Sequence, residues 1–227
     1  MADIDFTRAF RVLVGPEKQA FTVHHDIINR RSAFFRAASS ERWTSVEKVI
    51  ELPDDKSQVF ARYLQCLYNN KTWFDDLSQP RGMTGEGDFD LRANRTILRL
   101  VHAYILADKL QDLKSCNLII DRLIHDSDEL QRIPNNYALN LIYNQTPKAS
   151  PLRKLVVDFL VYEANAENDS YNMEDAPIEF LQEVIREDAR LKNENARERV
   201  EDVFAQKVSE LGKCRAHQHD ASHAVCE

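Results

Sequence analysis

The sequence predicts an α+β fold in which a small sheet near the N-terminus is followed by helices along most of the chain. Three observations predict it. Short apolar runs stand on both sides of Gly15-Pro16, a strong turn signal, as in a hairpin of two strands. A third apolar run at 49–52 is ended by Pro53, which cannot donate a ladder hydrogen bond. Beyond Pro53, apolar residues recur at the spacing that is typical of amphipathic helices.

Short helical segments are expected between the second and third strands. Ser32 is placed to cap the segment that carries Phe34 and Phe35. The helix after the third strand follows Asp54 and Asp55, which we expect to cap it. Its apolar side chains form one broad face that we expect to lie in the core, and they are Val59, Phe60, Tyr63, Leu64, Leu67 and Tyr68.

Residues 69–94 interrupt the helical periodicity with glycine, proline and acidic residues, and they predict a long surface loop. A loop of this length inside a compact domain is commonly functional or disordered. Near its start, Trp73, Phe74, Asp75 and Asp76 form the candidate partner-binding site. The competing interpretation has both aromatic rings packed back onto the core, because burial of an aromatic side chain is strongly favoured.

The rest of the chain predicts further helices. Apolar residues recur at helical spacing in segments separated by proline or polar residues: 97–110, 113–124, 137–143, 152–162 and 178–211. The first two segments are joined so closely that we expect them to pack antiparallel. Pro177 suits the first turn of the last segment. That segment is either one long helix or two, because polar residues 193–195 weaken its centre.

Charge and composition exclude several classes of function. The net charge is −7 over 227 residues, and residues 163–212, with 14 acidic and 6 basic side chains, carry −8, which leaves +1 for the remainder. The sequence has no stripe of basic residues that could bind a phosphate backbone, so we expect no nucleic-acid binding. The N-terminus lacks a secretory signal, and no apolar run approaches the roughly 18 residues that span a bilayer, so no membrane partner is expected. The four cysteines fit a reducing compartment, so we expect a cytoplasmic or nuclear protein.

An ordered set of short motifs in the N-terminal half is similar to that of a known family. These motifs are Val14-Gly15, Phe21-Thr22-Val23-His24, Ile27-Ile28, Ser32-Ala33-Phe34-Phe35, Trp43 and Ile50-Glu51-Leu52-Pro53. Two helical motifs follow at 60–68 and 100–110, the second with Leu110 where the family commonly has an aromatic residue. From about Phe10 to about Asp126, the chain resembles the BTB (POZ) domain, in particular the BTB proteins common in fungi.

The resemblance implies a BTB/POZ fold, a small mixed sheet flanked by helices, over residues 1–128, with an insertion at about 69–94. An all-α C-terminal extension at 129–213 and a Cys/His-rich tail at 214–227 follow it. The implied function is a protein-protein interaction module, an adaptor that forms a homodimer and recruits protein partners to a cullin-type ubiquitin-ligase scaffold. Two features depart from the family. Arg11 replaces an acidic residue near the dimer interface, and the insertion falls beside the surface through which cullin-binding members dock.

His24, His25 and Asp26 invite a catalytic or metal-binding interpretation. Neighbours at the end of a strand point to different faces, and no second group of ligands is expected to converge there. The resemblance implies a structural role for His24. The sequence also lacks a phosphate-binding loop, a nucleophile elbow and a zinc-protease helix. We therefore expect no enzymatic activity.

The C-terminal tail concentrates two of the four cysteines and three of the seven histidines. Its candidate metal ligands are Cys214, His217, His223 and Cys226, with His219 as a substitute. These sulfur and nitrogen donors suit tetrahedral zinc, although only five residues separate His217 from His223, fewer than the usual spacing between ligand pairs. A flexible tail without metal is the competing interpretation. If zinc binds, the alternative function is a zinc-binding or metal-responsive protein whose BTB-like core serves as a dimeriser.

Overall fold

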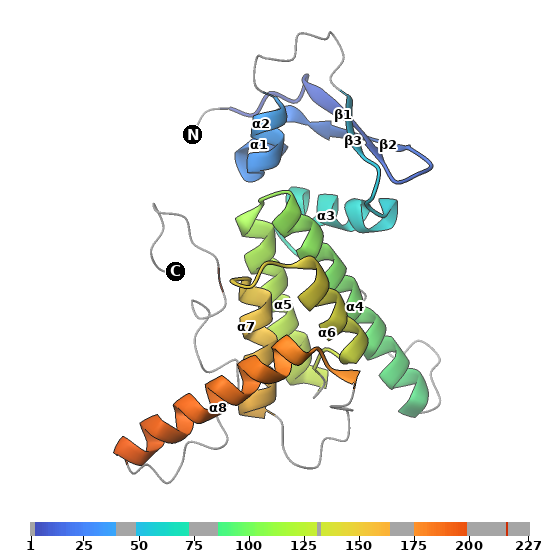
Figure 1. The fold of residues 1–227 in the computed structure, drawn as a ribbon. Coiled ribbons are helices and arrows are strands. Elements are labelled where there is room, and N and C mark those ends of the chain that lie inside the picture. The colour runs from blue at the N-terminus through green and yellow to red at the C-terminus, as the bar shows by residue number, and fades with distance from the viewer. Residues whose placement is uncertain are drawn as a thin grey trace. The chain divides into compact units, whose positions relative to one another are not determined.

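The structure is a computed structural model, and it describes residues 3–39, 49–72, 86–130, 133–163, 175–198 and 217. The chain forms two compact units, neither of which is continuous in sequence. The first unit comprises Met1–Phe74 and His102–Ile119, and the second comprises Asp75–Val101 and Ile120–Glu227. The described part of the chain holds a small sheet and a larger set of helices, so the expected α+β class is correct (Figure 1).

The sheet belongs to the first unit and has the strand order β2-β1-β3. Its strands are β1 (Ala9–Val14), β2 (Gln19–His24) and β3 (Val49–Leu52). β1 and β2 form the expected antiparallel hairpin, whereas β3 lies parallel to β1 along its other edge. At the hairpin turn Gly15 has a φ of 78°, and its N–H donates to the Leu52 carbonyl at 2.9 Å. Glycine suits this turn because it adopts a positive φ without steric cost.

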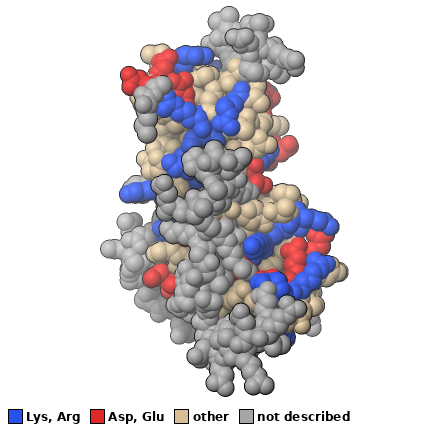
Figure 2. All heavy atoms as spheres, turned by 90° about the vertical axis from the view of Figure 1, so that its left-hand side faces the viewer, with Lys and Arg blue, Asp and Glu red and all other residues tan. Residues whose placement is uncertain are grey.

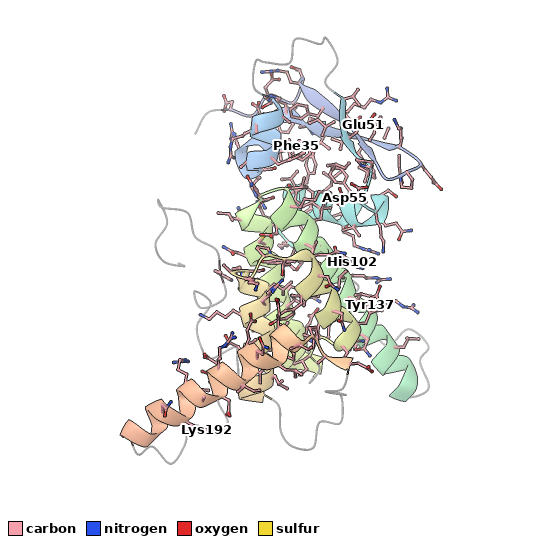
Figure 3. The ribbon with its side chains drawn as sticks, viewed as in Figure 1. Phe35, Glu51, Asp55, His102, Tyr137 and Lys192 are labelled. Carbon is pink, nitrogen blue, oxygen red and sulfur yellow. The ribbon has the colours of Figure 1, made fainter. Side chains whose placement is uncertain are left out.

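Three helices complete the N-terminal part of the first unit: α1 (His25–Arg31), α2 (Ala33–Ala38) and α3 (Ser57–Asn69). Ser32 caps α2 as expected, because its Oγ accepts a hydrogen bond from the Phe35 amide at 3.2 Å. Phe35 lies between the helices and the sheet, with its ring 5.9 Å from that of Phe10 (Figure 3). Other fully buried side chains of this core are Val12, Val14, Val23, Ile28, Phe60 and Tyr63.

Two long helices follow, α4 (Glu86–Lys109) and α5 (Leu113–Leu130), and each contributes residues to both units. The expectation of a surface loop over 69–94 is wrong for its last part, because α4 already begins at Glu86. Ala93 and Ile97, one turn apart, are both buried, so this side of α4 packs against the rest of the protein.

Two expectations for α3 are also wrong. Asp54 and Asp55 do not cap the helix, whose N-cap is Lys56 without a side-chain hydrogen bond. The Asp55 carboxylate instead lies 2.7 Å from Lys109 Nζ of α4, and a full opposite charge is a stronger partner than a backbone amide. Tyr68, expected in the core, is 39% exposed. It lies in the last turn of α3, where residues 68–70 are all exposed.

The second unit contains α6 (Asn136–Gln145), α7 (Pro151–Asp158), a π-helical turn η1 (Phe159–Glu163) and α8 (Ile178–Glu198). Asn135 caps α6 by accepting from the Ala138 amide at 3.0 Å, and Pro151 begins α7. α8 begins at Ile178, as expected. Pro177, which was expected in its first turn, stands just before the helix, and its carbonyl accepts the Leu181 amide hydrogen bond at 3.1 Å. Residues 199–211 of the predicted last helical segment lie outside the described residues.

The described core of the second unit combines buried apolar side chains of α6, α7, η1 and α8 with those from its parts of α4 and α5. They include Leu139, Ile142, Leu152, Leu155, Val156, Phe159 and Phe180. In the described part of the chain, no helix combines the length and the apolar character that crossing a membrane requires.

Candidate interaction surfaces

A buried ion pair joins three helices of the first unit. Arg31 at the end of α1 donates from Nε to Asp112 Oδ1 at 3.0 Å, and this carboxylate is fully buried just before α5. Tyr63 of α3 donates to Asp112 Oδ2 at 3.2 Å, and Ser115 donates to the same carboxylate through its amide and its hydroxyl. Burial and the Asp112 charge raise the pKa of Tyr63, so its hydroxyl keeps its proton. The cluster is hydrogen-bonded throughout and acts as a scaffold.

The two adjacent histidines make separate contacts within the first unit. His24 Nδ1 lies 2.9 Å from the Tyr68 hydroxyl, which also accepts the His24 amide hydrogen bond at 3.0 Å. His25 Nδ1 lies 3.1 Å from Asp26 Oδ1, and Asn29 Nδ2 lies 2.9 Å from His25 Nε2. Among the residues that the structure describes, no group of three or more His, Cys, Asp or Glu side chains could hold a metal ion.

Beside these histidines, the N-terminal segment leaves aromatic surface exposed. Phe6 is 60% exposed and packs edge-on against the His24 ring at 5.4 Å, and Tyr68 packs against the same ring at 5.8 Å. The Asp5 amide holds the segment by donating to Asp26 Oδ2 at 3.0 Å, a hydrogen bond that lowers the pKa of the Asp26 carboxyl. The sequence analysis did not identify Tyr68 as a surface residue. Its position in the last turn of an amphipathic helix could have indicated that it is exposed.

A cleft of about 360 Å³ opens beside the hairpin turn of the first unit. Its lining includes Val14, Gly15, Pro16, Glu17, Gln19 and residues 54–58. Three carboxylates face this region, and Asp55 among them is paired with Lys109. Lys56 also lines the cleft, so Lys56 and Lys109 together offset two of the three carboxylates and the cleft carries little net charge.

In the second unit, Arg153 of α7 connects α6 to α8. Its guanidinium is 4.5 Å above the Tyr143 ring and donates to the Tyr143 carbonyl at 2.6 Å, and Nε donates to Thr146 Oγ1 at 3.1 Å. Nη1 donates to Glu179 Oε2 at 3.0 Å, and this hydrogen bond and the nearby Lys148 lower the pKa of Glu179. One side chain therefore satisfies carbonyls at the end of α6 and holds the first turn of α8.

α8 buries one face and exposes the other. Phe180 is fully buried, with its ring 5.8 Å from that of Tyr143, whose hydroxyl donates to Glu183 Oε2 at 2.5 Å. Ile178 and Ile185 are 74% and 67% exposed. Because they are seven residues apart, they lie on one side of the helix. This side forms an apolar stripe that the described residues leave uncovered.

Tyr137 of α6 adds a third exposed apolar side chain to the second unit. It is 63% exposed and points away from the helices behind it (Figure 3). Asn140, one turn further along α6, donates to the Asp175 carbonyl at 3.1 Å, three residues before Ile178. This hydrogen bond connects α6 to the segment before α8.

Charged side chains cover other parts of the surface. In the first unit, Arg30 and Arg31 end α1 and Arg36 lies in α2, and Lys and Arg side chains gather on the face that Figure 2 shows. In the second unit, both signs alternate along α8, where Arg190 pairs with Glu187 and Lys192 pairs with Asp188. These pairs offset part of the acidic charge of α8.

Most of the predicted site residues lie outside the described residues. These are Trp73, Phe74, Asp75 and Asp76 of the partner-binding prediction, and Cys214, His219, His223 and Cys226 of the metal prediction. His217 is described, and its Nε2 lies 3.0 Å from Asp121 Oδ1 of α5. The Cys/His pattern made His217 a candidate, but nothing in the sequence indicated Asp121 as its neighbour.

No model of a protein family matches the chain, and no curated protein matches it.

Proposed function

We propose that the chain is a protein-protein interaction module of the BTB type, an adaptor that forms a homodimer and recruits protein partners to a cullin-type ubiquitin-ligase scaffold. The observation that carries the proposal is the order of elements in the first unit. A hairpin, two short helices, a third strand and α3 follow one another, with α4 and α5 after them. Apart from Trp43, which lies outside the described residues, the motifs that resemble the family occur within or directly beside these elements in the same order.

Further support comes from the kind of surface that the protein presents. Phe6, Tyr137, Ile178 and Ile185 are each at least 60% exposed, and large apolar side chains gain free energy when a partner covers them. The buried Arg31–Asp112 pair and the Arg153 contacts hold the helices beneath such surfaces. A rigid scaffold favours binding, because less conformational entropy is lost when the partner docks.

Sedimentation of the purified chain tests the homodimer. At high micromolar concentration we expect the mass of two chains, and a monomer at that concentration contradicts this part of the proposal. The scaffold is tested separately, by titrating a purified cullin N-terminal domain into the chain and measuring the heat of binding.

The partner-binding residues are tested with the variant Trp73→Ala/Phe74→Ala. We expect it to lose most of its affinity for the cullin domain, because aromatic anchors commonly dominate an interface. The matched control is Leu91→Ala, which removes an exposed apolar side chain outside the predicted site and outside the surfaces described above. If both variants lose affinity equally, the assigned partner-binding site is wrong. If the unmodified chain does not bind the cullin domain, the scaffold part of the proposal is wrong.

A second candidate function is zinc binding by the Cys/His tail, and the position of His217 against α5 favours it. A histidine held by a carboxylate is the usual arrangement in zinc sites. The purified protein is expected to hold about one zinc ion per chain by elemental analysis, as one tetrahedral site requires, and Cys214→Ser/Cys226→Ser is expected to lose it. Native protein that contains no zinc contradicts this candidate function.

A further inference from the structure

The outer edge of β2 is open. β2 lies at one end of the three-stranded sheet, and no strand of the described residues pairs with its second side (Figure 1). Gln19, Ala20 and Thr22 are exposed along it. β2 contains no Lys, Arg, Asp, Glu or Pro, the residues that commonly protect a free edge from pairing with another chain. β3 at the opposite edge differs, because it carries Glu51 and ends directly before Pro53.

The hydrogen bonds at the end of β2 fix which of its backbone groups point away from β1. The His25 amide donates to the Arg8 carbonyl at 2.9 Å, next to the start of the β1–β2 ladder. The preceding amide, that of His24, donates to the Tyr68 hydroxyl at 3.0 Å instead. Along an antiparallel pair of strands, successive residues alternate between the two sides. The even-numbered residues of β2 therefore direct their backbone groups away from β1.

Two of these even-numbered residues, Ala20 and Thr22, have outward backbone groups without a partner among the described residues. Each offers one donor and one acceptor. Two such residues, separated by one position, match a second copy of themselves. When two β2 strands lie antiparallel about a two-fold axis at Phe21, Ala20 of each copy faces Thr22 of the other. The two facing pairs exchange four hydrogen bonds, because each hydrogen-bonded pair of an antiparallel ladder exchanges two.

The side chains suit the same register. Ala20 and Thr22 are small and uncharged, so no like charges meet across the axis. Phe21 faces Phe21 of the second copy in a non-hydrogen-bonded pair, where side chains come closest. Its ring packs on Phe60 of α3 with the centroids 5.1 Å apart, and it is partly exposed. The second ring therefore covers apolar surface that one chain alone leaves to solvent.

We propose that the chain forms its homodimer by pairing the β2 strands of two copies, which joins their sheets edge to edge. The partner is a second copy, because the register that satisfies the open groups of Ala20 and Thr22 is symmetric. The inference rests on the homodimer of the proposed function and names its interface. Strand pairing of this length buries little surface, so the dimer is expected to be weak.

Sedimentation equilibrium of the full-length chain tests the interface through the variant Thr22→Pro. The Thr22 amide points outward, so proline removes it without breaking a hydrogen bond to β1, and an edge strand tolerates proline at such a position. Two of the four hydrogen bonds are lost, because both copies carry the substitution. We expect the dissociation constant of the dimer to rise roughly 30-fold or more, as for two lost hydrogen bonds.

Two control variants keep the proposed interface. Thr22→Ala retains the outward amide and removes only the side chain. Glu51→Pro places a proline in β3, at the opposite edge of the sheet. Residue 51 also points away from β1, because its neighbour Leu52 accepts the Gly15 amide hydrogen bond. Both variants are expected to dimerise as the unmodified chain does, and circular dichroism monitors the fold of each.

Amide exchange of the unmodified chain gives a readout that needs no variant, and it decides the case if Thr22→Pro fails to fold. Followed by NMR, the Ala20 and Thr22 amides are expected to exchange quickly in dilute solution and to become protected as the concentration rises. The Phe21 and Val23 amides belong to the ladder with β1, so they are expected to be protected at every concentration.

The outcomes separate the interface from the homodimer itself. If the chain dimerises and Thr22→Pro dimerises equally well, the homodimer stands and the β2 interface is overturned. The same holds if the Ala20 and Thr22 amides exchange freely in the dimer, or if Glu51→Pro weakens the dimer as much as Thr22→Pro does. If the chain is a monomer at high micromolar concentration, both the homodimer and the β2 interface are overturned, and the open edge is left to a strand of another protein.

Discussion

Asp112 and Arg153 are buried charged side chains whose hydrogen bonds join elements far apart in the sequence. Asp112 accepts from Arg31, Tyr63 and Ser115 in the first unit, and its carboxylate is fully buried. A buried charge is tolerated only when partners replace the water it has lost. Removal of one member leaves the others without a partner, so the effect on stability exceeds that of a single hydrogen bond.

Asp112→Ala is expected to lower the free energy of unfolding by roughly 3 to 5 kcal/mol, because it leaves the Arg31 guanidinium without its counter-charge. Urea denaturation followed by circular dichroism measures the change. Asp54→Ala, which removes an exposed carboxylate of the same unit, is the control and is expected to change little. Equal effects of the two substitutions contradict the scaffold role of Asp112.

His102 in α4 is half-buried, and burial, with Lys56 and Arg62 nearby, holds its pKa below the usual 6.5 (Figure 3). The unfolded chain therefore binds this proton more tightly than the folded chain does. The contribution of neutral His102 to stability is complete above about pH 6.5 and decreases as the pH falls below it.

We expect the NMR titration of the His102 ring to give a pKa below 6.5, and Lys56→Gln to raise it. Lys18→Gln, a change in an exposed lysine of the same unit, serves as the control. A pKa at or above 6.5 in the unmodified protein rules out the desolvated environment.

At the scale of elements, local patterns and long-range contacts contribute differently. The hairpin, the third strand and the cap of α2 follow from turn residues, proline and Ser32, which act on their immediate neighbours. The beginning of α4 and the environment of Tyr68 depend on residues from distant parts of the chain. α8 belongs to this second kind, because Arg153 and Tyr143 hold its first turns.

Arg153→Ala is expected to loosen the first turns of α8. It removes the link from Arg153 to Glu179 of α8. It also leaves the buried Tyr143 and Thr146 carbonyls without the Arg153 donor, and each buried unsatisfied acceptor costs roughly 1 to 3 kcal/mol. Hydrogen exchange of the α8 amides is therefore expected to increase on the order of tenfold or more. Lys154→Ala, the exposed neighbour, is the control. Unchanged exchange in Arg153→Ala excludes the anchoring role.

At the scale of the whole molecule, the cysteines divide between core and tail. Cys66 and Cys116 are buried thiols. Burial raises the pKa of Cys66 to about 11 and that of Cys116 well above its ordinary value. The thiolate is the reactive form of cysteine. Cys214 and Cys226, by contrast, belong to the proposed zinc site of the tail.

Alkylation of the native protein at pH 8 is expected to leave Cys66 and Cys116 unmodified, because little thiolate forms in either. Cys214 and Cys226 are expected to react in the presence of a chelator and to be protected when zinc is added, since a coordinated thiolate is shielded. Peptide mass mapping assigns the modified positions. Rapid alkylation of Cys66 contradicts the packing of α3. If added zinc does not reduce the alkylation of Cys214 and Cys226, the metal site is contradicted.

The sequence by itself determined the α+β class, the hairpin, the third strand before Pro53, the Ser32 cap and most helices. Each of these depends on residues close together in the chain, where turn chemistry and apolar periodicity act directly. It also identified the candidate ligands of the tail, because clustering of cysteine and histidine is visible without a structure.

Only the tertiary structure decided which distant residues meet. It paired β3 with β1 in parallel, and it formed the ion pairs of Asp55 with Lys109 and of Asp112 with Arg31. It also placed His217 Nε2 3.0 Å from Asp121 Oδ1. Such partners are chosen by burial and by the need to satisfy charges, and both depend on the packing of the folded chain.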